Sequence, residues 1–167
     1  MQRDSMNDEV KTKSLSIDEW CDMARKGIDV PVRIQLSGYS MQPLIRYKRD
    51  YVTIIPLRRQ LMISDVVVFK TYDGRFCCHR VSKLNDGRVQ TFGDNTVQPD
   101  PWMPESSVIG LVTEVERSGK TYSLDCRAAR AYGKLHMALF PFRKFKRDVI
   151  QLLWKYYVKV FKRKGDK

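Results

Sequence analysis

The chain has 167 residues, 43% of them hydrophobic, which is enough for the core of one ordinary domain and excludes a disordered chain. Its net charge is +12, but residues 127–167 carry +11 of it and residues 1–126 only +1. The basic charge therefore gives no reason to expect nucleic-acid binding by the body of the protein, and any anionic partner belongs to the C-terminal tail.

The cysteines and the N-terminus indicate a cytoplasmic protein. Cys21, Cys77, Cys78 and Cys126 have neither the density of a disulfide scaffold nor the spacing of a metal site, so we expect reduced thiols, no metal and no cofactor. The polar N-terminus lacks the apolar core of a signal peptide, and no segment approaches the roughly 20 apolar residues of a membrane span. Peripheral attachment to a membrane is compatible with this pattern.

The N-terminal region is predicted to contain a flexible lead over residues 1–15 and a short helix over residues 16–27. Ser16 and Glu19 have the spacing of a capping box at the start of this helix. Trp20 lies on its apolar side, so we expect the helix to pack on the body through the indole ring.

Residues 30–126 have the pattern of a mainly β domain, with β-branched and aromatic runs separated by turn residues. Because no helical segment separates the runs, neighbouring strands are expected to pair antiparallel. We predict tight hairpin turns at Asp73-Gly74, Asp86-Gly87 and Ser118-Gly119, the first two with two-residue loops. The expected strands are Val30–Leu36, Asp50–Pro56, Val66–Tyr72, Phe76–Leu84, Gly87–Gly93, Val108–Arg117 and Lys120–Asp125.

The segment Leu36–Leu44 reads Leu-Ser-Gly-Tyr-Ser-Met-Gln-Pro-Leu and is the first candidate for a functional site. Gly38 permits a tight backbone turn, and Pro43 prevents continuation as a central strand. Ser40 is therefore predicted to lie in a turn at a strand end, where a nucleophile has to be accessible. Serines in turns rich in glycine and proline are also common for purely structural reasons.

Ser40, His79 and Asp100 together have the residue types of a nucleophile, a general base and an orienting carboxylate. A serine hydroxyl needs an adjacent base, and a carboxylate selects the tautomer of the histidine. Strand alternation puts Cys77, His79 and Val81 on one face of their strand. A single histidine on such a face is often only a packed core residue.

Six short segments resemble, in the same order, the sequence boxes of type I signal peptidases, over about residues 32–115. In the branch of the endoplasmic reticulum and archaea, histidine replaces the lysine base of the bacterial branch. The matching segments are Ser37-Gly38-Tyr39-Ser40-Met41-Gln42-Pro43 for the nucleophile, Asp50-Tyr51-Val52 and Ser64–Phe69 for two strands, His79-Arg80-Val81 for the base, Gly93-Asp94-Asn95 with Asp100 for the third catalytic residue, and Val108–Val112 for the closing strand.

The resemblance implies an antiparallel signal peptidase/LexA-like β domain that hydrolyses peptide bonds through an acyl-enzyme. Ser40 is then the nucleophile and its backbone amide an oxyanion donor, His79 the general base and Asp100 the orienting carboxylate. It further implies an extended peptide substrate bound along an edge strand, with small residues before the scissile bond. The residues expected to shape the site without reacting are Gly38, Met41, Pro43, Gly93, Asp94 and Asn95.

The match has departures and leaves alternative assignments. Arg49 and Ser64 stand where glycine usually precedes the aspartate of each strand box, and the family's membrane anchor has no counterpart. Asp94 is the alternative third residue, although a role in the turn that presents Asp100 is preferred. Three further residues are considered and not preferred: Lys83 as base, Cys77 as nucleophile and His136 as a catalytic histidine.

Residues 127–167 are predicted to form a basic amphipathic helical tail interrupted at Pro141. One interpretation is a helix packed on the β body; the other is an interfacial helix that binds an anionic membrane through residues 140–167. Nucleic-acid binding is disfavoured because the apolar face is dense. The face expected to meet a membrane or partner comprises Phe145, Val149, Leu153, Trp154, Tyr157 and Phe161.

Two other functions remain open from the sequence. A LexA-like self-cleaving regulator shares the serine-methionine box, but those proteins use a lysine base and carry an N-terminal DNA-binding domain, for which residues 1–29 are too short. A non-catalytic binding module would keep the β fold and use the basic tail. The complete set of Ser40, His79 and Asp100 favours a serine endopeptidase of signal-peptidase type over both.

Overall fold

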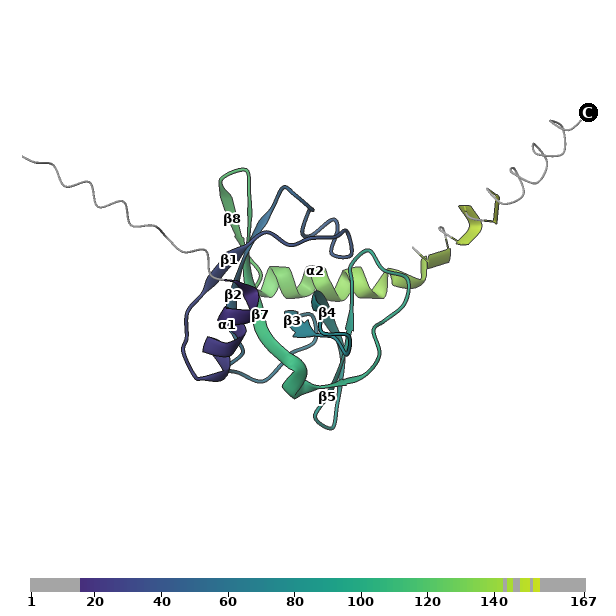
Figure 1. The fold of residues 1–167 in the computed structure, drawn as a ribbon. Coiled ribbons are helices and arrows are strands. Elements are labelled where there is room, and N and C mark those ends of the chain that lie inside the picture. The colour runs from purple at the N-terminus through teal and green to yellow at the C-terminus, as the bar shows by residue number, and fades with distance from the viewer. Residues whose placement is uncertain (1–15, 143, 146–147, 151, 154–167) are drawn as a thin grey trace, which may run out of the picture.

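The computed structural model describes residues 16–142, 144–145, 148–150 and 152–153. Over these residues the protein is a mainly antiparallel β domain with a short N-terminal helix and a C-terminal helix (Figure 1), as the sequence predicts. The elements are α1 (Ile17–Arg25), β1 (Val32–Ile34), β2 (Tyr51–Pro56), β3 (Val66–Lys70), β4 (Phe76–Asn85), β5 (Arg88–Phe92), β6 (Met103–Pro104), the 3₁₀ turn η1 (Glu105–Ser107), β7 (Val108–Arg117), β8 (Lys120–Ser123) and α2 (Arg127–Ala138).

The described strands form one antiparallel sheet in the order β1-β2-β7-β3-β4-β5-β6, and β8 pairs with β7 beside this path. The pairing of β2 with β7 shifts in register between Thr53 and Ile54, and that of β3 with β7 shifts between Val68 and Phe69. Bulges of this kind increase local twist and bend a strand. β7 is visibly curved in Figure 1, so the sheet curls around its contents.

β3 explains why the sequence has a continuous apolar run rather than an alternating one. It lies between β7 and β4, and its first four residues are all buried. Val66 and Val68 pack in one core cluster with Trp20, whereas Val67 and Phe69 pack in a second cluster on the other face. Because both faces of the strand are covered, every position can be apolar.

The predicted N-terminal helix is confirmed as α1, with the capping box that its sequence indicates. The Ser16 hydroxyl accepts the Glu19 amide, and the Glu19 carboxylate accepts the Ser16 amide. Trp20 is fully buried, and its indole N–H donates to the Val30 carbonyl oxygen at 2.7 Å. The indole therefore attaches the helix to the sheet without leaving a buried donor unpaired.

Two of the predicted hairpin turns are confirmed. Asp86-Gly87 joins β4 to β5, and Ser118-Gly119 joins β7 to β8. All four residues have positive φ, between 44° and 75°. That is the backbone of a type I′ turn, whose twist matches the twist of the paired strands.

The prediction of a two-residue turn at Asp73-Gly74 is wrong, because the loop is longer. The Gly74 amide donates to the Thr71 carbonyl at 2.9 Å, and the Thr71 amide donates to the Arg75 carbonyl at 2.9 Å. Only Gly74 in this loop has positive φ, which is the pattern of a type I turn followed by a bulge. β3 consequently ends before Thr71, and the sequence also gave no signal for β6 and η1.

The first part of the predicted basic tail is docked on the β body rather than separate from it. α2 runs beside β3 and β4 in Figure 1. A Cβ at Gly133 would overlap the Ser64 hydroxyl oxygen and Arg80 Nη1, so only glycine permits this approach. Beyond the helix, the ring edge of Phe140 contacts Phe92, with centroids 4.6 Å apart.

The remaining predictions for the termini are only partly covered by the structure. The proposed lead of residues 1–15 and the tail residues Trp154, Tyr157 and Phe161 lie outside the described residues. Within the described residues, no helix combines the length and the hydrophobicity needed to cross a bilayer.

Candidate functional site

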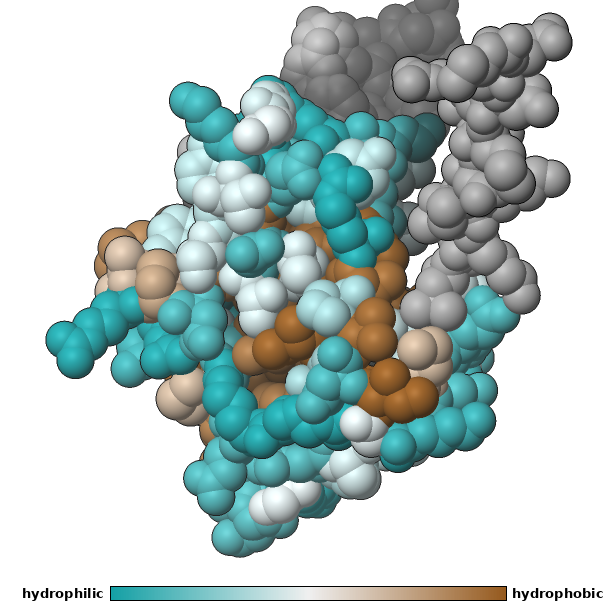
Figure 2. All heavy atoms as spheres, turned by 90° about the vertical axis from the view of Figure 1, so that its left-hand side faces the viewer, coloured by the Kyte–Doolittle hydropathy of each residue, from teal (hydrophilic) through white to brown (hydrophobic). Residues whose placement is uncertain are grey.

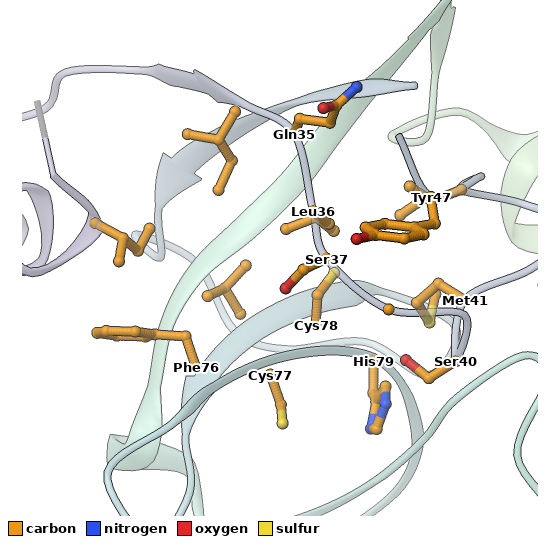
Figure 3. Close-up of a pocket in the computed structure, with 15 residues that line it drawn as sticks. Gln35, Leu36, Ser37, Ser40, Met41, Tyr47, Phe76, Cys77, Cys78 and His79 are labelled. Atoms are coloured by element: carbon orange, nitrogen blue, oxygen red, sulfur yellow. The ribbon is translucent and has the colours of Figure 1, made fainter. Parts of the chain in front are cut away.

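A groove of about 260 Å³ lies between the segment that follows β1 and the first half of β4. The face of the molecule that carries α1 and β1 has a hollow in which apolar side chains are framed by hydrophilic ones (Figure 2). The groove lining is mainly apolar and includes Leu36, Val68 and Phe76. Ser40 and His79 lie next to each other at one end of it (Figure 3).

The backbone that carries Ser40 is held from several directions. Met41 and Ile45, on either side of the following turn, are both 4% exposed and belong to the core. The Ile45 amide donates to the Met41 carbonyl at 2.9 Å, and the Arg117 guanidinium donates to the Leu44 carbonyl at 2.9 Å. A side chain on such a turn is positioned before any ligand arrives.

The entry into this turn and its exit use residues that the sequence singled out. Gly38 has φ of +101°, a conformation that residues with a Cβ rarely adopt, and the Gln42–Pro43 peptide bond is cis. At the exit, buried Asp50 binds the Arg117 guanidinium at 2.6 Å and the Arg46 amide at 2.8 Å. Burial tends to raise the pKa of the Asp50 carboxyl, but these hydrogen bonds outweigh it and hold the pKa below its usual value.

His79 is oriented by Asp100, which is anchored to β5. The His79 Nδ1 lies 2.6 Å from Asp100 Oδ2, and the Thr91 hydroxyl donates to the same oxygen at 2.6 Å. The Asp100 amide also donates to the Thr91 carbonyl at 2.9 Å. A ring nitrogen that faces a carboxylate carries hydrogen, so Nε2 is left as the acceptor of the neutral imidazole.

Gly93 marks the place where the Ser40 turn and the His79 ring meet. A Cβ at Gly93 would lie 2.9 Å from the Ser40 carbonyl oxygen and 3.1 Å from His79 Nε2. The acceptor nitrogen of the ring therefore lies on the Ser40 side, opposite the nitrogen bound to Asp100. Any larger residue at position 93 would push the serine turn and the imidazole apart.

No protein-family model matches this chain, and no curated protein matches it. The function therefore has to be argued from the geometry of this site. Within the described residues, no group of three or more His, Cys, Asp or Glu side chains is arranged to hold a metal ion.

The alternative third residue, Asp94, has a different partner from Asp100. Its carboxylate binds the Arg80 guanidinium through two hydrogen bonds of 2.7 and 2.8 Å. The two side chains are 3% and 0% exposed. Since Arg80 follows His79 on β4, it points to the opposite face of the strand, and Asp94 lies with it.

The other candidates from the sequence lie in positions less suited to catalysis. Lys83 is exposed and lines a separate pocket with Phe140. Cys77 lines the groove, but burial raises the pKa of its thiol, which keeps it protonated and poorly nucleophilic. His136 lies on α2, where its Nε2 is 2.9 Å from the Asp94 carbonyl oxygen.

Sequence reasoning missed the contacts that three residues make at the site: Thr91, Arg80 and His136. Thr91 had no sequence signal, because a threonine in a strand is ordinary. Arg80 had one, since a charged residue beside a buried histidine in a strand needs a buried partner. His136 had none, because it is 42 positions from the carbonyl that it contacts.

Proposed function

We propose that the protein is a serine endopeptidase of signal-peptidase type, with Ser40 as nucleophile, His79 as general base and Asp100 as orienting carboxylate. The observation that carries the proposal is the 2.6 Å contact between His79 Nδ1 and Asp100 Oδ2, in a ring whose other nitrogen lies on the side of Ser40. Two independent features, the order of the sequence boxes and this geometry, support the same three residues.

The chemistry follows from the position of each proton. Ser40 Oγ attacks the carbonyl carbon of the scissile peptide bond while its proton passes to His79 Nε2. The carbon–nitrogen bond then breaks, and the proton on Nε2 goes to the leaving amine. Water attacks the resulting Ser40 ester with His79 again as base, which releases the carboxylic acid and restores the serine hydroxyl. Throughout, Asp100 keeps hydrogen on Nδ1 and stabilises the transient imidazolium.

The backbone amide of Ser40 is the proposed donor to the developing oxyanion. Among the described residues, this amide has no hydrogen-bond acceptor, so it is available to a ligand. Its turn is fixed by core side chains and by the bond from Arg117, so the donor needs little rearrangement during the reaction.

An extended peptide fits the groove because two strand edges beside it are unpaired within the described residues. Among the described strands, β1 is the last on its side of the sheet and pairs only with β2. β4 pairs with β3 from Phe76 to Arg80, but its pairing with β5 begins only at Arg80. The edge of Phe76–His79 and the segment Gln35–Gly38 both line the groove, so a peptide strand can bind between them by β-augmentation.

A serine-directed acylating probe, such as a fluorophosphonate, tests the proposal directly. We expect stoichiometric labelling of the folded protein, with the adduct mapped to Ser40 by peptide mass spectrometry. Labelling should be lost after unfolding, because the free serine hydroxyl is unreactive. No adduct, or an adduct on another serine, would refute the assignment of the nucleophile.

We propose an anionic membrane surface as the place where this peptidase meets its substrates. The described residues that follow the middle of α2 expose large apolar side chains, and residues 127–167 have a net charge of +11. Apolar side chains combined with basic ones are typical of interfacial helices. The exposed residues are Leu135, Leu139, Phe142, Phe145, Val149, Ile150, Leu152 and Leu153, which include three of the six positions expected from the sequence.

Co-sedimentation with liposomes tests this surface. The full chain should bind vesicles containing anionic lipid and bind neutral vesicles less, and replacing Leu139, Phe142 and Phe145 together by serine should weaken binding at least about tenfold. Tyr72→Ser is the matched control, because Tyr72 is 90% exposed but lies on the loop between β3 and β4. Equal binding by the triple variant and the control would exclude this membrane surface.

A further inference from the structure

We propose that His136 is a positioning residue for the nucleophile, acting from α2 through the peptide group between Asp94 and Asn95. The inference rests on the proposed function. His136 lies on α2, outside every segment that resembles the peptidase family. Two hydrogen bonds at opposite ends of one peptide group carry it.

The peptide group between Asp94 and Asn95 connects the helix to the serine. Its carbonyl oxygen lies 2.9 Å from His136 Nε2, and its N–H donates to the Ser40 carbonyl oxygen at 2.6 Å. A nitrogen facing a carbonyl oxygen must carry hydrogen, so His136 is the donor in this pair. A donor on the carbonyl side also polarises the N–H and strengthens its bond to Ser40.

This arrangement fixes the orientation of the peptide group. If the group rotated, its carbonyl would leave His136 and its N–H would leave Ser40, so both bonds oppose the rotation. The Asn95 side chain adds a weaker contact, from Nδ2 to the Tyr39 carbonyl at 3.2 Å. Because Gly93 lies against both the Ser40 carbonyl and His79 Nε2, the path of this loop determines the spacing of serine and imidazole.

α2 holds His136 firmly enough for this role. The Tyr132 ring stacks on the imidazole with centroids 5.6 Å apart. Six residues before His136 on the same helix, the Ser64 hydroxyl donates to the Arg130 carbonyl at 3.2 Å. Ser64 adopts φ of +84°, where glycine is favoured, and its hydroxyl also accepts from Arg80 Nη1 at 3.3 Å. These contacts attach the helix to the buried Arg80 and Asp94 pair.

The expected consequence is a loss of turnover without a loss of substrate binding. His136 does not line the groove between β1 and β4, so its removal leaves the peptide contacts unchanged. Removal of His136 does free the loop that supports Ser40. A misplacement of the serine by about 1 Å can cost around 100-fold in rate. We therefore expect His136→Ala to lower kcat about 10- to 100-fold with KM nearly unchanged.

The test compares His136→Ala with two other variants of the full chain. His136→Gln retains an N–H donor on a side chain of similar reach and should recover much of kcat. Lys134→Ala alters an exposed residue of the same helix and should behave as wild type. Hydrogen exchange of the Asn95 amide, followed by NMR, gives a readout independent of catalysis. It should accelerate at least about tenfold in His136→Ala and remain slow in the other two.

The outcomes separate this inference from the proposed function. If wild type cleaves peptides or labels at Ser40 and His136→Ala does so at the same rate, the positioning role is wrong and the peptidase stands. The role is also wrong if the Asn95 amide stays protected in His136→Ala, or if glutamine does not restore kcat. If wild type neither cleaves nor labels, the peptidase proposal fails, and the amide exchange still decides whether His136 holds the loop.

Discussion

Ser40→Ala should reduce kcat for peptide cleavage by about 10⁴- to 10⁶-fold, the range expected when a serine peptidase loses its nucleophile. The change removes one hydroxyl from a half-buried turn whose core contacts come from Met41 and Ile45, so the thermal unfolding midpoint should shift little. Residual cleavage above the uncatalysed rate would come from the oxyanion donor and from substrate binding. Steady-state kinetics on a fluorogenic peptide and a melting curve measure both effects.

Ser37→Ala is the matched control, because Ser37 lines the same groove and the substitution removes the same group. Its activity should stay within about tenfold of wild type, since the proposal assigns the base His79 to Ser40 and gives Ser37 no part in the chemistry. A second comparison measures the rates of the Ser40 and His79 single alanine variants and of the double variant. If Ser40 and His79 act as one unit, the double alanine variant should be no slower than either single variant. Additive losses, or an active Ser40→Ala protein, would rule out the assigned pair.

Arg80→Met should lower the free energy of unfolding by about 3–5 kcal/mol, a large part of the roughly 5–15 kcal/mol that stabilises most domains. The Asp94 carboxylate is fully buried and bound to Arg80 through two hydrogen bonds. Methionine fills much of the space but removes the two hydrogen bonds and the positive charge that Arg80 gives to this carboxylate. The substitution also removes the 3.0 Å bond from Arg80 to the Ser64 carbonyl. Urea unfolding followed by circular dichroism measures the change.

Arg33→Met is the control for the loss of an arginine from an ion pair. Arg33 binds Glu116 at 2.7 Å, but the two side chains are 50% and 34% exposed. We expect a much smaller loss of stability than in Arg80→Met, because solvent screens the pair. Replacing Asp94 by leucine in the Arg80→Met background should recover part of the lost stability, since the buried carboxylate that lost Arg80 is then removed. If Arg80→Met and Arg33→Met lower the free energy of unfolding equally, burial of the Arg80 and Asp94 pair has no specific role.

Local rules were sufficient for much of the fold. The capping box at Ser16, the type I′ turn at Asp86-Gly87 and the apolar run Val66–Phe69 of β3 each depend on residues that are close in sequence. Alternation along a strand also predicted that His79 and Arg80 point to opposite faces, because successive side chains in a strand diverge. Each of these features is determined by a few residues that are neighbours in the sequence.

The sequence by itself determined a mainly β chain with an exposed serine turn, a histidine in a strand and two candidate aspartates. Only the tertiary structure decided between them: Asp100 lies against His79, whereas Asp94 lies against Arg80. It also brought His136 to the Asp94 carbonyl from 42 positions away. The physical reason is that both contacts depend on the course of an irregular loop and on the docking of α2 at Gly133, and no short-range periodicity encodes either.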